Sequence, residues 1–360
     1  MRKTTRYITL CLMSLLAFAG CDVHEFPEES GYGPTPFLLH LDFNTEMPLH
    51  KEVAYTRSKA DNSDPHDIRY VIGVYRNGES EVADTTVVFT KSDISDLNYT
   101  AKLNLYEGEY TFRVWADYVD TGETSDKYYN TEDFTKIILA DQNNHSGSND
   151  YRDAFRGTAT ATVLNPSYYT GIAASSIKNE ATVEMIRPMG KFKFVSTDVE
   201  VFLNRVSQML QSRGVGKIDY VSLDSKAAYE QLWQTLKIDD FKVVFRYNPY
   251  MHNSFNIFTD KPAGSWTGIS FTSQMQSDSK EEITLGYDYV FVNGTETTLG
   301  ISVEVYNDEG VLMSSTRTIN VPVLRSKLTI VKGEFLTSKA SGGITIDPGY
   351  DGEDFNIEIK

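Results

Sequence analysis

The feature that most constrains the fold of this 360-residue chain is a repeated alternation of apolar and polar residues along short segments. In residues 68–75 the apolar side chains fall on every second position, and so share one face of an extended strand; they are Ile68, Tyr70, Ile72 and Val74. Similar segments, rich in β-branched and aromatic residues, occur at 37–43, 85–90, 99–105, 110–117 and 241–247. The pattern predicts an all-β protein built of antiparallel β-sandwiches.

One region departs from this alternation. Residues 197–200, with the sequence TDVE, match a helix capping box, and apolar residues then recur at helical spacing up to Gly214. A second helix is expected near residues 225–236. Because an apolar stripe of this kind usually packs on a sheet, we expect a helical insertion at about residues 197–237 of an otherwise β domain.

A break in the strand pattern divides the folded part of the chain. Between residues 164 and 180, the segment Asn165-Pro166-Ser167 and a run of small residues interrupt the strands. We therefore expect an N-terminal β-sandwich at residues 37–170 and a C-terminal β-sandwich at residues 180–360, each of ordinary domain size.

The first 20 residues predict export. A basic start is followed by an apolar run at residues 7–19, which is too short to span a bilayer core of about 30 Å and is typical of a signal peptide. The small residues Ala19 and Gly20 suit a signal peptidase, so we expect cleavage between Gly20 and Cys21.

Cys21 is expected to carry a lipid. The segment Phe18-Ala19-Gly20-Cys21 resembles a bacterial lipobox, in which the thiol is acylated with diacylglycerol and the cysteine becomes the first residue. The other cysteine, Cys11, is removed with the signal peptide, so the mature chain has no internal disulfide. An ordinary signal peptide followed by an unrelated cysteine is the alternative. A lipidated Cys21 predicts an outer-membrane lipoprotein, bound to the membrane through lipid such as palmitate.

Residues 21–36 are expected to form a tether that lifts the folded body off the membrane. The segment contains acidic residues and repeated prolines and glycines, and little that could pack into a core. Acidic residues just after a lipidated cysteine resemble the surface-export signals of Bacteroidota lipoproteins, which would place the protein on the cell exterior. The alternative is a linker without any such signal.

The charge of the chain argues against a nucleic-acid partner. The formal net charge is −16 at pH 7, and removal of Arg2, Lys3 and Arg6 with the signal peptide makes it more negative. Such a surface repels nucleic acid and anionic lipid headgroups.

No catalytic or metal site is recognisable from the sequence. The six histidines are scattered, and no pair has metal-ligand spacing on one element. The oxygen-rich segments 61–67 and 347–352 are faintly similar to calcium-binding loops but lack the EF-hand spacing, and oxygen-rich loops are usually solvated turns. We expect a protein that is not an enzyme and that has no cofactor and no metal ion.

Four segments resemble the fimbrillin-like proteins of Bacteroidales, which build type V pili. They are residues 105–118 (LYEGEYTFRVWADY, similar to a hairpin of that family), 153–157 (DAFRG), 186–198 (IRPMGKFKFVSTD) and 321–337 (VPVLRSKLTIVKGEFLT). The resemblance implies two tandem transthyretin-like β-sandwich domains and a role in pili, without enzyme activity or cofactor. The likeness is closest to lipid-anchored fimbrial anchor and accessory proteins and their lipoprotein relatives.

The resemblance also implies how partner subunits join, by strand exchange. Polymerising pilins of this family lose an N-terminal strand to a protease that cuts after arginine, and a neighbour then donates a strand to the groove. Arg57 lies where such a cut would fall; the alternative, which we favour, is a plain loop arginine. An anchor keeps its first strand, since a cut at Arg57 would release the body from its lipid. Residues 343–347 and 355–359 are candidate donor strands or, alternatively, ordinary edge strands.

A surface glycan-binding lipoprotein of a polysaccharide-uptake system is the alternative function. It would share the anchor, the acidic charge, the tandem sandwiches and the many aromatic residues. A glycan site needs several tryptophan or tyrosine side chains together on an exposed face, whereas Trp115, Trp233 and Trp266 are spread along the chain. The exposure of the aromatic side chains therefore discriminates between the two functions.

Overall fold

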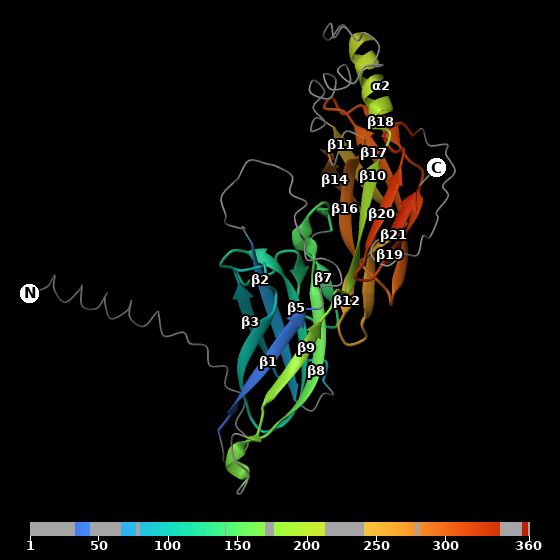
Figure 1. The fold of residues 1–360 in the computed structure, drawn as a ribbon. Coiled ribbons are helices and arrows are strands. Elements are labelled where there is room, and N and C mark those ends of the chain that lie inside the picture. Colours follow the sequence, from blue (N-terminus) through green and yellow to red (C-terminus); the bar gives the residue numbers. More distant parts are fainter. Residues whose placement is uncertain are drawn as a thin grey trace, which may run out of the picture.

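The computed structural model describes residues 33–43, 66–76, 80–140, 142–169, 176–212, 241–277, 281–338 and 355–358, with the side chains of 207–212, 277 and 355–358 excepted. The described part is mainly β-strand, with one α-helix, α2 (Val199–Ser212), and the short 3-10 helices η1 (Asp150–Arg152) and η2 (Pro166–Tyr168). Figure 1 shows two β-sandwiches that follow one another along an elongated molecule. The predicted all-β sandwich fold is therefore confirmed.

The first sandwich consists of two sheets that face each other across an apolar core. One sheet has the strand order β4-β1-β9 and the other β3-β2-β5-β8. The strands are β1 (Thr35–Phe43), β2 (His66–Arg76), β3 (Thr85–Lys91), β4 (Tyr99–Leu105), β5 (Gly108–Asp120), β8 (Phe155–Val163) and β9 (Glu180–Met185). The four apolar residues of β2 that share a face in the sequence pattern all lie in this core, together with residues from the other six strands.

The connection between β4 and β5 is not the hairpin that the sequence predicts. β4 pairs with β1, whereas β5 pairs with β2 and β8, so this connection carries the chain from one sheet to the other. The Tyr110 hydroxyl donates a hydrogen bond to the backbone oxygen of Tyr106 at 3.0 Å, as tyrosines do at the corners of β-sandwiches. Alternation predicts each strand, but it does not say which sheet the strand joins.

The second sandwich also consists of two sheets. Their strand orders are β15-β16-β10-β20-β21 and β14-β11-β17-β18, with β19 paired to β17. The strands are β10 (Met189–Ser196), β11 (Lys242–Asn248), β14 (Ser270–Gln274), β15 (Gln276–Ser277), β16 (Ile283–Phe291), β17 (Glu296–Tyr306), β18 (Leu312–Ser315), β19 (Ile319–Leu324), β20 (Leu328–Gly333) and β21 (Phe355–Glu358).

Helix α2 begins where the capping box predicts a helix, at the end of the second sandwich that lies far from the first (Figure 1). Its apolar side chains Val199, Phe202, Leu203 and Val206 are buried in the core of the sandwich. The packing of this face explains why a helix is stable within a β domain. The second predicted helix, near residues 225–236, lies outside the described residues.

Among the described strands, three pairs are parallel: β1 with β9, β10 with β20, and β20 with β21. The pairing of β9 with β1 corrects the predicted domain boundary, because β9 belongs to the first sandwich although it begins at residue 180. The chain therefore passes to the second sandwich between Met185 and Met189. The interruption at residues 164–180 connects β8 to β9, two strands of the same sandwich, so its turn-forming residues mark a connection within a domain.

A further sheet joins the two halves of the molecule. β6 (Tyr129–Asn130) and β7 (Ile137–Leu139) come from the segment between β5 and β8, and they pair with β12 (Tyr250–Asn256) and β13 (Lys261–Thr267) from the second half. The order is β13-β12-β7-β6, and Phe255 lies opposite Ile137. β6 and β7 have only two and three residues, which is too short for alternation to reveal them.

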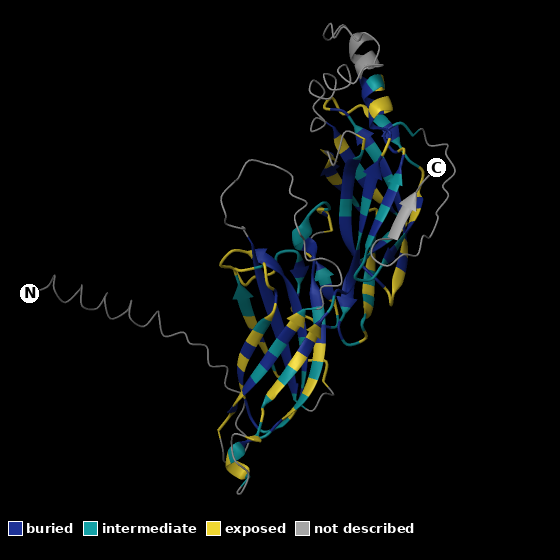
Figure 2. Cartoon of the chain, viewed as in Figure 1, coloured by how far each residue is buried: buried dark blue, intermediate teal, exposed yellow. Residues whose placement is uncertain are grey.

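One apolar core runs from this joining sheet into the second sandwich. Val71 of β2 and Trp115 of β5, on the outer face of the first sandwich, belong to the same cluster as Phe255 of β12. Trp115 packs edge-on against Tyr129, with ring centroids 5.3 Å apart. β2 is therefore buried on both of its faces, and Figure 2 shows buried residues along the strands of both sandwiches. The sandwiches are packed together rather than connected by a free linker.

Candidate functional site

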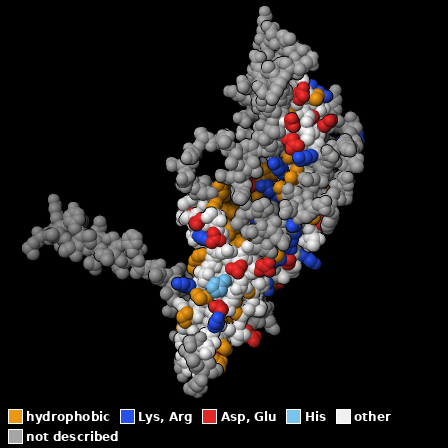
Figure 3. All heavy atoms as spheres, viewed as in Figure 1, with side chains coloured by type: hydrophobic (Ala, Val, Ile, Leu, Met, Phe, Trp, Pro, Cys, Tyr) orange, Lys and Arg blue, Asp and Glu red, His pale blue; other side chains and the backbone are white. Residues whose placement is uncertain are grey.

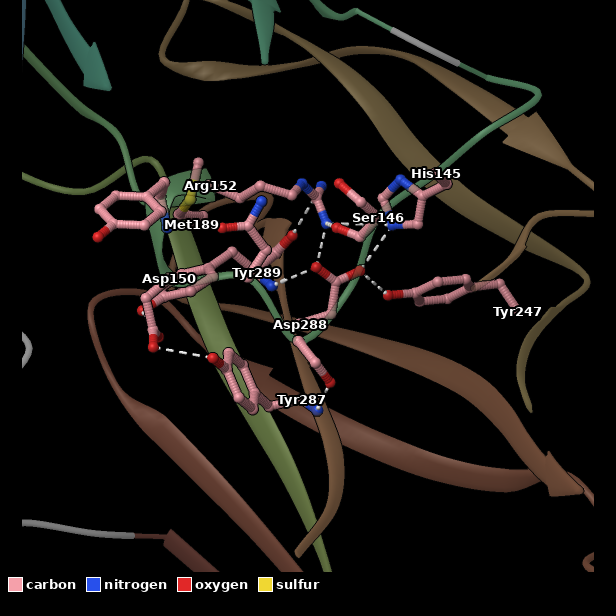
Figure 4. A network of polar contacts seen from close by, with 12 residues as sticks. His145, Ser146, Asp150, Arg152, Met189, Tyr247, Tyr287, Asp288 and Tyr289 are labelled. Atoms are coloured by element: carbon pink, nitrogen blue, oxygen red, sulfur yellow. Dashed lines mark hydrogen bonds and ion pairs between the residues drawn. The ribbon is translucent and has the colours of Figure 1, made fainter. Parts of the chain in front are cut away.

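A buried network of polar side chains lies at the junction of the two halves (Figure 4). Its centre is Asp288 of β16, whose carboxylate is paired with the guanidinium of Arg152. His145 Nε2 lies 2.7 Å from Asp288 Oδ2, and the Tyr247 hydroxyl donates to the same oxygen. His145 and Arg152 belong to residues 142–153, between β7 and β8, which we call the strap. The network thus connects the strap to β11 and β16 of the second sandwich.

The groups of this network are almost completely shielded from solvent. The residue Asp288 is 1 % exposed and Arg152 is 2 % exposed. Burial acts to raise the pKa of Asp288, but the charge of Arg152 and the contact with His145 outweigh it, and the pKa lies below its ordinary value. Burial, and then the charge of Arg152, lower the pKa of His145. At neutral pH the network is therefore an arginine–carboxylate pair supported by a neutral imidazole and a neutral phenol.

The strap is also held by its backbone. The Ser148 N–H donates to the carbonyl oxygen of Tyr287 at 2.7 Å, and the Tyr287 N–H donates to Ser148 Oγ at 3.2 Å. Next to it, a Cβ atom on Gly147 would lie 2.3 Å from ring atoms of Phe271, so only glycine allows the strap to lie this close to the second sandwich.

A second group of ion pairs surrounds the turn between β12 and β13. Asp260 in this turn accepts hydrogen bonds from Arg156 of β8 at 2.8 Å and from Arg325 at 2.7 Å. Arg187, between β9 and β10, pairs with Asp153 at 2.9 Å. These contacts and the network around Asp288 join the halves of the molecule at several points. Their arrangement is suited to holding the two sandwiches in one orientation.

The first strand has a special position in the first sandwich. β1 is the central strand of its sheet, antiparallel to β4 and parallel to β9. Its inward-facing residues Phe37, Leu39 and Leu41 are at most 1 % exposed. Removal of β1 would leave two unpaired strand edges with an apolar floor between them, which is the form of groove that accepts an extended segment.

The residues predicted to be lipidated or cleaved lie outside the described part of the chain. These are Gly20, Cys21 and Arg57. Arg57 falls between β1 and β2, so the predicted cut would separate β1 from the rest of the chain. The tether at residues 21–36 is described only from Gly33 onward. Within the described residues, no helix is both long and apolar enough to cross a membrane.

The candidate donor strands and calcium-like segments are described only in part. Residues 343–347 and 347–352 lie outside the described residues, whereas 355–358 form β21, at the edge of the second sandwich beside β20. From the segment 61–67, His66 and Asp67 are described, and Asp67 Oδ2 accepts a hydrogen bond from the Gly122 N–H at 3.0 Å. In the described ranges, no group of three histidine, cysteine, aspartate or glutamate residues is arranged to hold a metal ion.

Aromatic side chains are mostly buried. Among the described residues, Tyr168 is the one aromatic side chain that is exposed, at 45 %. Trp115 is fully buried, Trp266 is half-buried, and Trp233 lies outside the described residues. On the face shown in Figure 3, acidic and basic side chains are interspersed. The described surface thus presents no cluster of exposed aromatic rings.

Comparisons with known proteins were made for sequence and for structure. The model of one protein family, described as a family of unknown function (DUF6562), matches residues 34–360. No curated protein matches the sequence.

Several solved structures are similar to the chain over most of its length. The fimbrial anchor protein Mfa2 from Porphyromonas gingivalis has 9% identity and a TM-score of 0.37, over 79% of this chain and 82% of that chain. A fimbrial assembly protein from Parabacteroides distasonis has 10% identity and a TM-score of 0.37, over 83% of this chain and 90% of that chain. A candidate cell adhesion protein from Bacteroides eggerthii has 11% identity and a TM-score of 0.40, over 92% of this chain and 100% of that chain.

Proposed function

The chain belongs to the DUF6562 family, and we propose that it is a non-catalytic lipoprotein of the cell surface that serves as an anchor or accessory subunit of a type V pilus. The proposal rests on the sequence segments that resemble fimbrillin-like proteins and on the position of β1. The membrane is reached through a lipid on Cys21, and the partners are other fimbrial subunits.

The observation that carries the proposal is that β1 fills its own sandwich. β1 follows the tether directly, and it is paired on both sides and buried. A subunit that keeps this strand remains connected to its lipid and needs no donated strand at that position. A repeating subunit holds the same strand only until the protease removes it, so retention of β1 in the mature protein is what distinguishes a membrane-bound terminal subunit.

The packed junction is a second support. An anchor has to transmit tension from a fibre to the membrane, so its two domains should not separate under load. Here the domains share an apolar core, a sheet and several buried or partly buried ion pairs.

The lipid attachment can be tested with Cys21→Ala. This change removes the only thiol of the mature chain, so we expect an unprocessed or released protein that no longer enters the detergent phase on phase separation. Cys11→Ala, within the signal peptide, is the matched control and should leave membrane retention unchanged. Normal retention of the Cys21→Ala protein would contradict the assignment.

The terminal strand can be tested with Ile357→Pro. Ile357 of β21 lies opposite Val331 of β20, and proline removes a backbone N–H that a strand pairing can use. If β21 is shared with a partner, we expect the monomer to stay folded while the amount of co-purified pilin falls. Ile344→Pro tests the other candidate segment in the same way. Unfolding of the isolated Ile357→Pro monomer, or unchanged recovery of pilin with a folded monomer, would rule out β21 as the donor.

The alternative, a glycan-binding lipoprotein, gains no support from the described surface, because Tyr168 is its one exposed aromatic side chain. Pull-down of the protein from native membranes separates the two functions. A ladder of pilin subunits is expected for a pilus component, whereas a co-purified polysaccharide importer would favour the alternative.

A further inference from the structure

Arg113 occupies an unusual position on the outer face of the first sandwich. Its guanidinium carbon lies 4.0 Å from the centroid of the Phe258 ring and 5.7 Å from that of Tyr75. Tyr75 comes from β2, whereas Phe258 comes from the turn between β12 and β13, and the two rings meet edge-on at 5.5 Å. Two elements from opposite halves of the chain thus hold the guanidinium in place, because a guanidinium is attracted to the face of an aromatic ring.

This guanidinium has no anionic partner among the described residues. Its Nε is buried without a hydrogen-bond partner, whereas the two terminal nitrogens are not buried, and the residue as a whole is half-exposed. Burial lowers the pKa of Arg113, and the group that acts in the opposite direction is Tyr75 rather than a carboxylate. A partly desolvated charge without a counter-charge is costly, so buried arginines are normally paired.

The carboxylate in the same turn as Phe258 is already engaged. Asp260 lies two residues beyond Phe258 in the same turn, but it is bound by both Arg156 and Arg325. In the register of β5 and β8, Arg113 lies opposite Thr158 and Arg156 lies opposite Trp115, so both arginines lie on the same face of the sheet. The turn therefore provides a carboxylate for Arg156 and Arg325 but none for Arg113, whose terminal nitrogens remain accessible to solvent.

We propose that Arg113, held between Phe258 and Tyr75, is a binding site for a small oxyanion, with a carboxylate as the favoured form. The two terminal nitrogens of an arginine form a fork that matches the two oxygens of a carboxylate, and a phosphate can use the same fork. The aromatic contacts fix the fork before binding, so little side-chain entropy is lost when the ligand binds. This site is independent of the pilus role.

The test is an NMR titration of the full mature protein in detergent, labelled with ¹⁵N. The probes are acetate, glucuronate and inorganic phosphate at constant ionic strength, with glucose as the neutral control. We expect a saturable shift of the Arg113 Nε–H signal, which is identified by its loss in Arg113→Lys. The amide signals of Thr111 and Thr158 should shift with it. A stronger response to the two carboxylates than to phosphate would establish carboxylate as the favoured form.

Two variants show whether the response belongs to this site. Arg113→Lys keeps the charge but not the fork, and should weaken the acetate response of Thr158 at least about tenfold. Arg246→Lys, at an arginine paired with Glu304 in the second sandwich, should leave the response unchanged. If Arg113→Lys fails to fold, Phe258→Leu replaces it and should also weaken binding. The absence of a saturable shift with any anion, an equal response to glucose, or undiminished binding by the folded Arg113→Lys or Phe258→Leu protein would overturn the proposal.

Discussion

Replacement of Asp288 by alanine is expected to lower the free energy of unfolding by about 3–5 kcal/mol, because it breaks a buried ion pair on one side only. Arg152 would remain 2 % exposed without its carboxylate, and His145 and Tyr247 would lose their shared acceptor. Since these groups join the strap to the second sandwich, loss of the carboxylate should also loosen the junction. Urea unfolding at neutral pH, followed by tryptophan fluorescence, measures the effect.

The matched control is Glu304→Ala. Glu304 pairs with Arg246 at 3.0 Å, but the two side chains are 24% and 47% exposed, and exposed pairs contribute about 0–1 kcal/mol. If Asp288→Ala lowered the free energy of unfolding by as little as Glu304→Ala, the buried network would not be what holds the strap on the second sandwich.

The contribution of the Asp288 carboxylate to the free energy of unfolding should also depend on pH. Because the folded state lowers the pKa of Asp288 below its ordinary value of 3.8, the stabilisation by its carboxylate is complete above that value. It is lost as the pH falls through the lowered pKa of the folded state. The difference in the free energy of unfolding between the parent protein and Asp288→Ala should therefore be constant near neutral pH. It should become smaller below about pH 3.8.

The strands and their inward faces could be predicted from the sequence because they depend on local periodicity. Leu39 and Leu41 are buried on alternate positions of β1, and α2 does begin within the predicted segment 197–200. Local patterns of this kind show which face of a strand or helix is buried, but they do not identify the residues that pack against it.

The junction could not be predicted in the same way, because its contacts join residues that are far apart in the sequence. His145 and Asp288 are separated by 143 positions, and the strap has no strand or helix pattern of its own apart from η1. The sequence did contain one signal: Asp288 is the one charged residue of strand β16, whose sequence is ITLGYDYVF. A buried carboxylate requires a partner, but the sequence does not identify Arg152 as that partner.

Replacement of Leu41 by alanine should lower the free energy of unfolding by about 2–5 kcal/mol, because it leaves a cavity in the core of the first sandwich. Leu41 is 0 % exposed on β1, where it lies opposite Tyr99 of β4 and Val183 of β9. The tight packing of this strand between its two neighbours leaves the surrounding residues little freedom to fill the space. Guanidinium unfolding of the purified protein, followed by far-UV circular dichroism, gives the change.

The control for Leu41→Ala comes from the same strand. Leu38 pairs with Lys102 of β4 but is only half-buried, so Leu38→Ala removes the same atoms at a more exposed position and should cost clearly less than Leu41→Ala. If β1 fills the core of its own sandwich, substitutions on its inward face should lower the free energy of unfolding, whereas substitutions on its outward face should have little effect. Equal effects of the two substitutions would mean that β1 does not fill the core of its sandwich. The proposal that this strand makes a donated strand unnecessary would then fail, even if Cys21 carries a lipid.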